Sequence, residues 1–516
     1  MVLCDLPYDE RYLIKNIIIL GIWYGTIKPP MESVLKNIFA SHIQHNHIYF
    51  KNNDLSFIVR IKYFIADKPA RSSVLGMQSS NSKFFCPVCL AQTNVLLNGQ
   101  RRSIICDFDQ EMQKRTNAGF SSCAYSAQIT GRPDYGIKSV SFLLSIANID
   151  IVDFNLFDYM HSVCLGIFKD LINLVFFTQS QNQVNRHIAA DYFDNIIKDF
   201  KYSGDIASVL PPLTKIKIWK AKDYKNFFLH ILPIGLDYLG SIEHRKCLED
   251  LRNGVYLLLC KDAISNADLV KDKFNSFLSS VSRLYGKSVL KPNFHDLFHL
   301  PDMVKSSGPL YEYSGFNFEN INGILSRMCK GNKRLDIQVT KKILLLIKSL
   351  YFEEKTKSRL CKEYFLWTSK SFKWKNCKFS MNGVDFFGKS RESSKYSCFF
   401  HNSSFPNIIY FNRASFLKKK ISTSDYDQNR QRVFSALIIL KDNTFLNLLE
   451  IVVDKNSREI FLIAEIHTVS IIMPGIYKLK EFISVSRLDF FNVFFQCNFC
   501  SIVRDHVILT PFLELN

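Results

Sequence analysis

Two pairs of candidate metal ligands, far apart in the chain, place the strongest constraint on how this protein can fold. Cys86 and Cys89 form a Cys-x-x-Cys pair, and His295 and His299 lie in the segment NFHDLFHL. A Cys-x-x-Cys turn can point two thiolates at one ion, and histidines at i and i+4 of a helix face the same way. If one Zn²⁺ ion binds all four, two distant segments must meet in the fold. Taken separately, the cysteines could be small buried apolar residues and the histidines unrelated residues on a helix surface.

An acidic residue lies on either side of these pairs in the sequence. Asp67 ends the run LSFIVRIKYFIA at residues 55–66, which predicts a strand, and Glu319 follows the histidines in GFNFENINGIL. Clustered carboxylates hold the Mg²⁺ ions that activate a nucleophile and stabilise a leaving oxygen in phosphoryl transfer. Considered alone, Asp67 is an ordinary strand-end or helix-capping residue, and Glu319 is a solvated helix residue.

The composition favours a nucleic-acid partner and an intracellular setting. The chain has 516 residues with 66 Lys and Arg against 47 Asp and Glu, a formal net charge of +19. Such a balance attracts polyanions, although a basic surface can also be inert. No apolar run reaches transmembrane length and no secretory leader is evident, so we expect a nuclear or cytoplasmic protein without a membrane partner. The 14 cysteines would then lie in a reducing compartment, where paired cysteines bind metals more often than they form disulfides.

Hydrophobic patterns divide the chain into helical and strand-rich regions. Residues 17–24 predict a strand, and a helix is expected to begin near Met31. Short β-rich runs after residue 380, such as NIIYF and EIFLIAEI, predict a separate small β domain. The resulting division is 1–90, a mainly helical 91–290, 291–355, and 380–516. Cys497 and Cys500 have no second ligand pair beside them, so we interpret them as strand cysteines.

Several ordered blocks of the sequence resemble one family of mobile-element enzymes. The blocks are DLPYDERYLIKNIIILGIWYGTIKPPM, FIADKPARSSVLGM, FDYMHSVCLGIFKDLI and SGPLYEYSGFNFENINGILSRM. Together with the order of Asp67, the Cys pair, the His pair and Glu319, they resemble the RNase H-like DDE transposases of the CACTA (En/Spm) group. The nuclease core of the V(D)J recombinase has a similar layout. The resemblance covers residues 5–350, and the ordered set is much more specific than any single motif.

The resemblance implies a mixed α/β fold, with an RNase H-like core interrupted by a large helical insertion and followed by a small C-terminal β domain. In the family the reaction is metal-dependent DNA cleavage and strand transfer. Asp158 and His161 match the family's Asp-x-Met-His block and could touch a phosphate or support the metal ligands; they could equally bond within a packed helix. The implied metal ligands are Cys86, Cys89, His295 and His299 for structural Zn²⁺, and Asp67 and Glu319 for catalytic Mg²⁺.

The family scheme has three acidic residues, and one of them is not matched here. Its first Asp lies on the first strand of the core, and this chain begins downstream of that block. Asp5 and Asp9 precede a Leu-Pro and Arg segment that the family places after the first Asp, so neither is a good substitute. We therefore expect residues 1–516 alone not to cut or join DNA. The alternatives are a non-catalytic DNA-binding or scaffold protein derived from such a transposase, and an unrelated zinc-stabilised interaction protein; a homo-oligomer is also considered.

Three groups of basic residues are candidate contacts to the DNA backbone. Arg71 follows the Asp67 turn, a second group lies beside Trp219, and a third follows Glu319. Each group could instead be a solvated face, which is the usual case for clustered charge. We interpret them as non-specific phosphate contacts, and no module for base-specific readout is visible. Besides Arg71, the residues are Lys215, Lys217, Lys220, Lys222, Lys225, Arg327, Lys330, Lys333 and Arg334.

Overall fold

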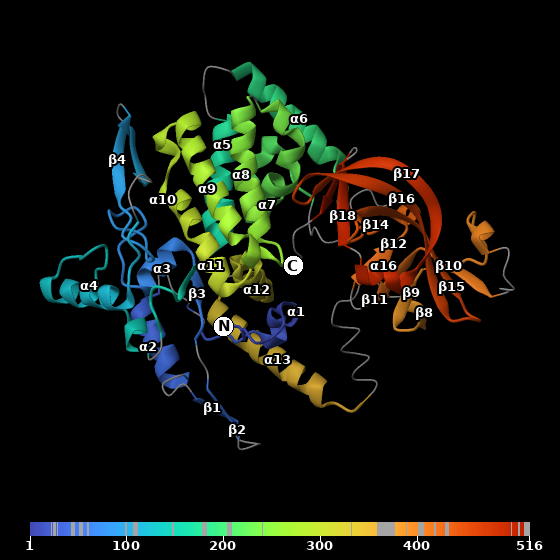
Figure 1. The fold of residues 1–516 in the computed structure, drawn as a ribbon. Helices are drawn as coiled ribbons and strands as arrows, with labels where there is room; N and C mark the ends of the chain where they lie inside the picture. Colours follow the sequence, from blue (N-terminus) through green and yellow to red (C-terminus); the bar gives the residue numbers. More distant parts are fainter. Residues whose placement is uncertain are drawn as a thin grey trace.

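A computed structural model of the chain shows a helix-rich part beside a C-terminal strand-rich part (Figure 1). The structure describes all residues except 22, 24–26, 28, 43–46, 51–54, 59–60, 99–100, 107–111, 147–148, 178–182, 204–208, 240, 332, 359–376, 389, 401–406, 417–418, 429–432, 497, 504–505 and 510–516. The mixture of helix and antiparallel sheet agrees with the expected mixed α/β class. An RNase H-like core remains a prediction.

The N-terminal elements follow the sequence patterns only in part. The expected helix is α2 (Met31–His42). The strand expected at 55–66 is broken, because β2 (Leu55–Ile58) pairs with β1 (His47–Phe50) and a separate strand, β3 (Phe64–Ala66), follows. Of residues 17–24, those that the structure describes are not in a strand. The described residues of this apolar run pair with no other strand in the described part of the chain, and pairing rather than propensity creates a sheet.

The helix-rich part contains a pair of short parallel strands. β3 pairs in parallel with β6 (Asn155–Phe157), so that Ala66 is opposite Phe157. The region expected to be a helical insertion therefore contributes a strand to this pair. An aspartate follows each strand directly, Asp67 after β3 and Asp158 after β6. Because the carboxyl ends of parallel neighbours meet at one edge, the pairing brings these two residues to the same edge.

The helices of this part of the molecule bury a large apolar core (Figure 1). Stacked aromatic rings fill much of it, including Phe168 on Phe228 with ring centres 4.0 Å apart. α8 and α9 pack against each other and contain many fully buried apolar residues. The helices are α3 (Lys68–Val74), α4 (Asn117–Thr130), the π-helix η3 (Met160–Phe168), α5 (Lys169–Phe177), α6 (Gln183–Asp199), α7 (Ala221–Asn226), α8 (Ile242–Leu258) and α9 (Ala263–Tyr285), followed by α10 (Pro292–His295), α11 (Leu300–Ser307), α12 (Gly315–Met328) and α13 (Leu335–Lys355).

One continuous helical stretch, Met160–Phe177, is long and apolar enough to cross a membrane by length and composition alone. Of its 18 residues, 56% are buried inside the protein. Core helices have the same composition, so this stretch is weak evidence for a membrane span.

The strands expected after residue 380 form a sheet that curls back on itself. β15 (Thr444–Asp454) pairs with β16 (Glu459–Met473) on one side and with β10 (Ile408–Phe411) and β14 (Leu437–Ile439) on the other. The pairing then continues through β18 (Asn498–Val503), β19 (His506–Leu509) and β17 (Ile476–Asp489) back to β16, which closes a ring of strands. A second sheet contains β8 (Cys377–Met381), β9 (Val384–Phe387), β11 (Arg413–Phe416) and β12 (Lys419–Ser422).

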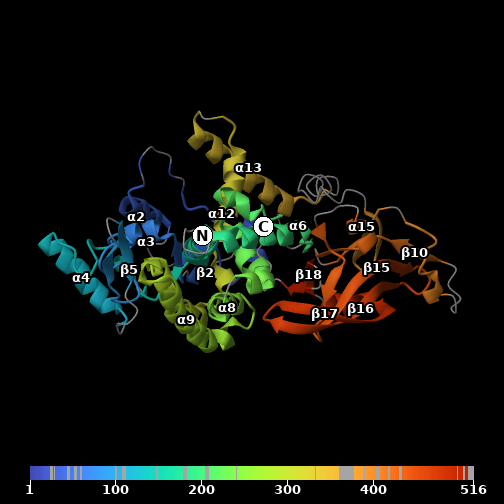
Figure 2. The same ribbon diagram turned by 90° about the horizontal axis from the view of Figure 1, so that it is seen from above.

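The turn between β16 and β17 joins the two parts of the molecule (Figure 2). The side chain of Arg252 on α8 donates a hydrogen bond to the carbonyl oxygen of Pro474 in this turn. The next residue, Gly475, packs so closely on Tyr256 that an added Cβ would lie 2.0 Å from the tyrosine oxygen. Tyr256 also donates to the carbonyl oxygen of Leu509, 3.1 Å away.

Candidate metal centre

The four cysteine and histidine ligands expected from the sequence come together in the structure. The Sγ atom of Cys89 lies 3.2 Å from Nε2 of His295, and Sγ of Cys86 lies 3.5 Å from Nε2 of His299. The two Nε2 atoms are 3.0 Å apart, and all four ligand atoms lie within 4.8 Å of one another. A tetrahedral Zn²⁺ with ordinary bond lengths requires ligand separations of about 3.3–3.8 Å. The separations, from 3.0 Å up to 4.8 Å, span this range, and the four residues have the chemistry to hold a metal ion such as zinc.

The two cysteines lie on a turn whose carbonyl oxygens accept hydrogen bonds from a buried arginine. The backbone N–H of Val88 donates to Sγ of Cys86, 3.4 Å away. Nε of the buried Arg115 donates to the carbonyl oxygens of Cys86 and Cys89, at 2.9 and 3.1 Å. Its Nη2 also donates to the carbonyl oxygen of Tyr135. Arg115 thus shapes the turn, although no motif in the sequence identified it.

The histidines lie at the two ends of a short helical connection. His295 ends α10 and His299 immediately precedes α11, with a single 3-10 turn between them. Phe294 stacks on Phe277 of α9, with ring centres 6.1 Å apart, and so anchors this segment in the core. His295 is fully buried. The shared face predicted for the two histidines is present even though the helix is not continuous.

The proton equilibria in this group favour one thiolate. Burial opposes ionisation of Cys86, but its hydrogen bond with Cys89 and the positive charges of His299 and His295 lower the pKa of Cys86 well below its ordinary value. The bond to Cys86 and burial raise the pKa of Cys89. Burial opposes protonation of His299, whereas the charge and hydrogen bond of Cys86 raise its pKa above the ordinary value. A divalent cation could replace these shared protons, because thiolate and neutral imidazole are its ligands.

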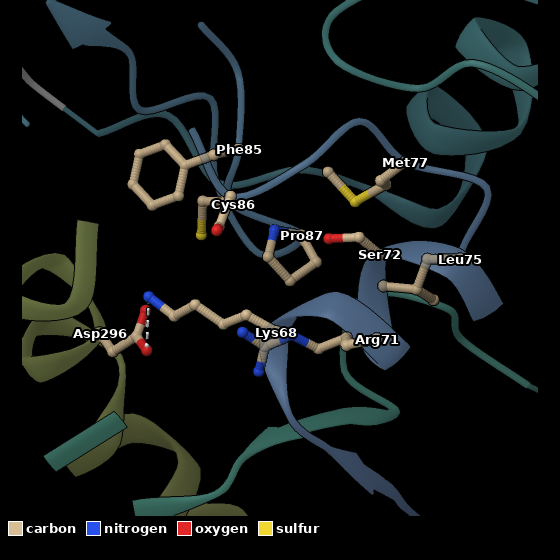
Figure 3. Close-up of a pocket in the computed structure, with 10 residues that line it drawn as sticks. Lys68, Arg71, Ser72, Leu75, Met77, Phe85, Cys86, Pro87 and Asp296 are labelled. Atoms are coloured by element: carbon tan, nitrogen blue, oxygen red, sulfur yellow. Dashed lines mark ion pairs between the residues drawn. The ribbon is translucent and has the colours of Figure 1, made fainter. Parts of the chain in front are cut away.

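A buried ion pair connects α3 to the four candidate ligands Cys86, Cys89, His295 and His299, which we call the metal group (Figure 3). Lys68, the first residue of α3, places Nζ 3.1 Å from Oδ2 of Asp296 and donates to the carbonyl oxygen of Pro292 at 2.9 Å. The hydroxyl of Ser162 donates to the same Asp296 oxygen at 2.6 Å. A small cavity of about 10 Å³ beside this pair is lined in part by Cys86. The pair therefore fixes the histidine segment against the helix that follows Asp67.

Among the described residues, the candidate catalytic carboxylates do not belong to a compact group of three or more ligands. Asp67 caps α3, with Oδ1 accepting a hydrogen bond from the Ala70 amide at 2.8 Å. Glu319 is exposed on α12. The charges of Asp67 and Glu319 both reach His161 and help to raise its pKa, after the larger effect of its hydrogen bond to Asp158. Within the described part of the chain, only the Cys86 group brings three or more His, Cys, Asp or Glu ligand atoms close together.

The structure separates the candidate DNA contacts into exposed and buried residues. Arg71 is only 4% exposed, and its guanidinium lies 4.2 Å above the Phe157 ring, so its position favours packing over contact with a DNA backbone. Lys225 lies over Phe316, and burial lowers the pKa of Lys225 to about 8. Lys222 is half-buried. The exposed members are Lys215, Lys217, Lys220, Arg327, Lys330, Lys333 and Arg334.

Of the second cysteine pair, Cys500 is buried in β18, and Cys497 lies outside the described residues.

Comparison with protein-family models and with curated proteins found no match to this chain.

Proposed function

We propose that this protein is a DDE transposase-like DNA-processing protein whose core is held together by a structural zinc ion. The carrying observation is that Cys86 and Cys89 meet His295 and His299 within 4.8 Å, although they are far apart in the chain. The order of the four cysteine and histidine ligands along the sequence then has a three-dimensional counterpart. The net charge of +19 supports DNA as the partner, and a DNA-processing protein would act in the nucleus.

The zinc role proposed here is structural. Four protein ligands fill a tetrahedral shell, which leaves no open position for water or substrate. The ion would join the turn after α3 to the segment between α10 and α11. Metal binding energy would therefore contribute directly to the stability of the core.

The catalytic role is proposed for Asp67 and Glu319. A divalent ion bound there would activate a nucleophile and stabilise the leaving oxygen in phosphoryl transfer on DNA. Asp67 is held by the capping bond to the Ala70 amide, so its remaining carboxylate oxygen is the one available to a cation. Glu319 is exposed on α12, so its carboxylate is accessible to a cation. Exposed lysines around Lys215 and Lys217 would contact the DNA backbone without reading its sequence.

Zinc analysis of the purified protein tests the structural part of this proposal. We expect close to one zinc per chain, with a clear reduction in Cys86→Ser and in His299→Ala. Cys123→Ser and His244→Ala are matched controls, because neither residue belongs to the metal group. Full zinc content in both ligand variants would refute the assignment.

A second candidate function is a non-catalytic DNA-binding or scaffold protein derived from a transposase. It is favoured by the absence of a compact carboxylate group among the described residues. Nicking of supercoiled plasmid with Mg²⁺ or Mn²⁺ tests whether residues 1–516 are an enzyme. Cleavage lost in Asp67→Ala and Glu319→Ala supports the enzyme and overturns the expectation that this chain alone does not cut DNA, whereas DNA binding without metal-dependent cleavage agrees with that expectation and with the scaffold.

A further inference from the structure

The long helix α13 presents an exposed apolar face that the proposed function does not use. Four large side chains on it, Leu344, Leu345, Ile347 and Tyr351, are between 52% and 64% exposed. Single exposed apolar residues are common, but a cluster of them marks a binding surface. The helix packs against α12, with Ile343 buried on its inner side, and lies at the edge of the helix-rich part in both views (Figures 1 and 2).

Three lysines, which we call the lysine row, run along the same face. Lys341, Lys348 and Lys355 are exposed and follow one another at seven-residue intervals, close to two turns of a helix. Their side chains therefore leave the helix on nearly the same side. Among the residues that the structure describes, none of the three forms an ion pair. The lysine row thus presents three positive charges without a carboxylate from the described part of the chain.

The lysine row divides the apolar face into two stripes. At about 100° per residue, Leu344, Ile347 and Tyr351 lie on one side of the row and Leu345 lies on the other. Nζ of Lys355 lies 5.9 Å from the centre of the Tyr351 ring, so charged and apolar groups are close neighbours here. A complementary surface must therefore offer negative charge along its middle and apolar side chains beside it.

Three common occupants fit this pattern less well. If the face bound a second copy of itself, the two lysine rows would meet, and like charges repel. A helix that lies on an anionic membrane has a continuous apolar face with its lysines on the opposite face. Duplex DNA would use the lysines for its phosphates but would leave the apolar side chains against a charged, hydrated backbone.

We propose that this face of α13 binds an acidic amphipathic helix of a partner protein. Aspartate or glutamate side chains of the partner would pair with the lysine row, and its apolar side chains would pack on the two stripes. Apolar residues at helical spacing supply the contact area in such helix recognition, and charges select the partner. The net charge of +19 would also speed the approach of an acidic protein. Binding at this face does not depend on any DNA-processing activity.

A synthetic peptide tests the lysine row in the full chain. The peptide is helical, has the 21-residue length of α13, and carries glutamates at seven-residue intervals with leucines on both sides; fluorescence anisotropy follows its binding. We expect the affinity to fall by about 10-fold or more in Lys341→Glu/Lys348→Glu/Lys355→Glu, because like charges then face each other. A second peptide, with lysines in place of the glutamates, should bind this triple variant and not the unmodified chain. Such an exchange of preference cannot come from an unfolded variant or from general attraction to a basic protein.

A second variant tests the apolar stripes. Leu344→Gln/Ile347→Gln should weaken binding of the glutamate peptide by about 10-fold, because apolar surface is no longer removed from water. Glutamine is a good helix former, so α13 itself should persist. The matched control is Ile264→Gln/Leu269→Gln on α9, where the two side chains are 52% and 51% exposed, and it should bind the peptide as the unmodified chain does.

Several results would overturn the proposal. They include no binding of the glutamate peptide to the unmodified chain, and equal binding to the unmodified chain and the triple lysine variant. Self-association of the unmodified chain that is lost in Leu344→Gln/Ile347→Gln would show that a second copy covers the face instead. Binding to phosphatidylserine vesicles or to duplex DNA that this double variant weakens as much as peptide binding would assign the face to a membrane or to DNA.

Discussion

Removing Lys68 should loosen the metal group even though Lys68 is not a ligand. The variant Lys68→Met keeps the length and apolar stem of the side chain but leaves Asp296 without its cation. In the pair, the lysine side chain is 13% exposed and the aspartate 2%. Breaking a buried ion pair from one side costs about 3–5 kcal/mol, because the remaining charge stays buried. Ser162 still donates to Asp296, which argues for the lower end of this range.

The chain contains a matched control for this prediction. Lys114 and Asp153 form an ion pair of nearly the same length, 3.0 Å, but both side chains are 67% exposed. Solvent screens such a pair, and we expect Lys114→Met to cost about 0–1 kcal/mol. The two variants therefore differ in burial and hardly at all in geometry.

Native-state hydrogen exchange measures the local effect without requiring the whole chain to unfold in one step. Peptides from α3 and from 292–300 should exchange about 10²- to 10³-fold faster in Lys68→Met, since 1.4 kcal/mol corresponds to a tenfold change. The corresponding change around Lys114 should be less than about fivefold. In the double variant Lys68→Met/Asp296→Leu most of the protection should return, because no charge is then left unpaired. Equal acceleration in Lys68→Met and Lys114→Met would refute the argument from burial.

Three further predictions follow from individual contacts. The hydrogen bond to Asp158 raises the pKa of His161 above the ordinary histidine value of about 6.5. The stabilisation from this pair is therefore full below the ordinary value and is lost as the pH rises through the raised value. NMR titration of His161 should show a lower pKa in Asp158→Asn. Gly475→Ala should separate the β16–β17 turn from α8 and increase proteolysis between the two parts, whereas Gly131→Ala, with a similar positive φ but no atom within 4 Å of the new Cβ, should not. Replacing Lys215, Lys217 and Lys220 together by Ala should reduce the slope of the logarithm of the DNA-binding constant against the logarithm of salt concentration by about 2.7. Lys441→Ala should leave this slope unchanged. An unchanged slope in the triple variant would exclude these lysines as phosphate contacts.

Local spacing was sufficient to predict the metal group and several elements of the fold. Cys-x-x-Cys and two histidines at i and i+4 each present their side chains together whatever the rest of the chain does, so the pairs could be recognised from the sequence. The helix beginning at Met31 also depends mainly on neighbours in the chain, and runs of β-branched and aromatic residues were sufficient to predict strands after residue 380. For such features, the pattern and the structure carry the same physical information.

Contacts between distant segments could be known only from the tertiary structure. Arg71 has the charge of a DNA contact, yet α3 packs it over Phe157, and no local pattern distinguishes a basic residue on a buried face from one on an exposed face. The partnership of Lys68 with Asp296 and the support of α12 by Asp158 join residues far apart in the chain. The packing of whole helices and strands decides which residues meet in this way. The sequence alone was therefore sufficient to identify the candidate metal ligands, whereas the residues that hold these ligands in place could be identified only from the fold.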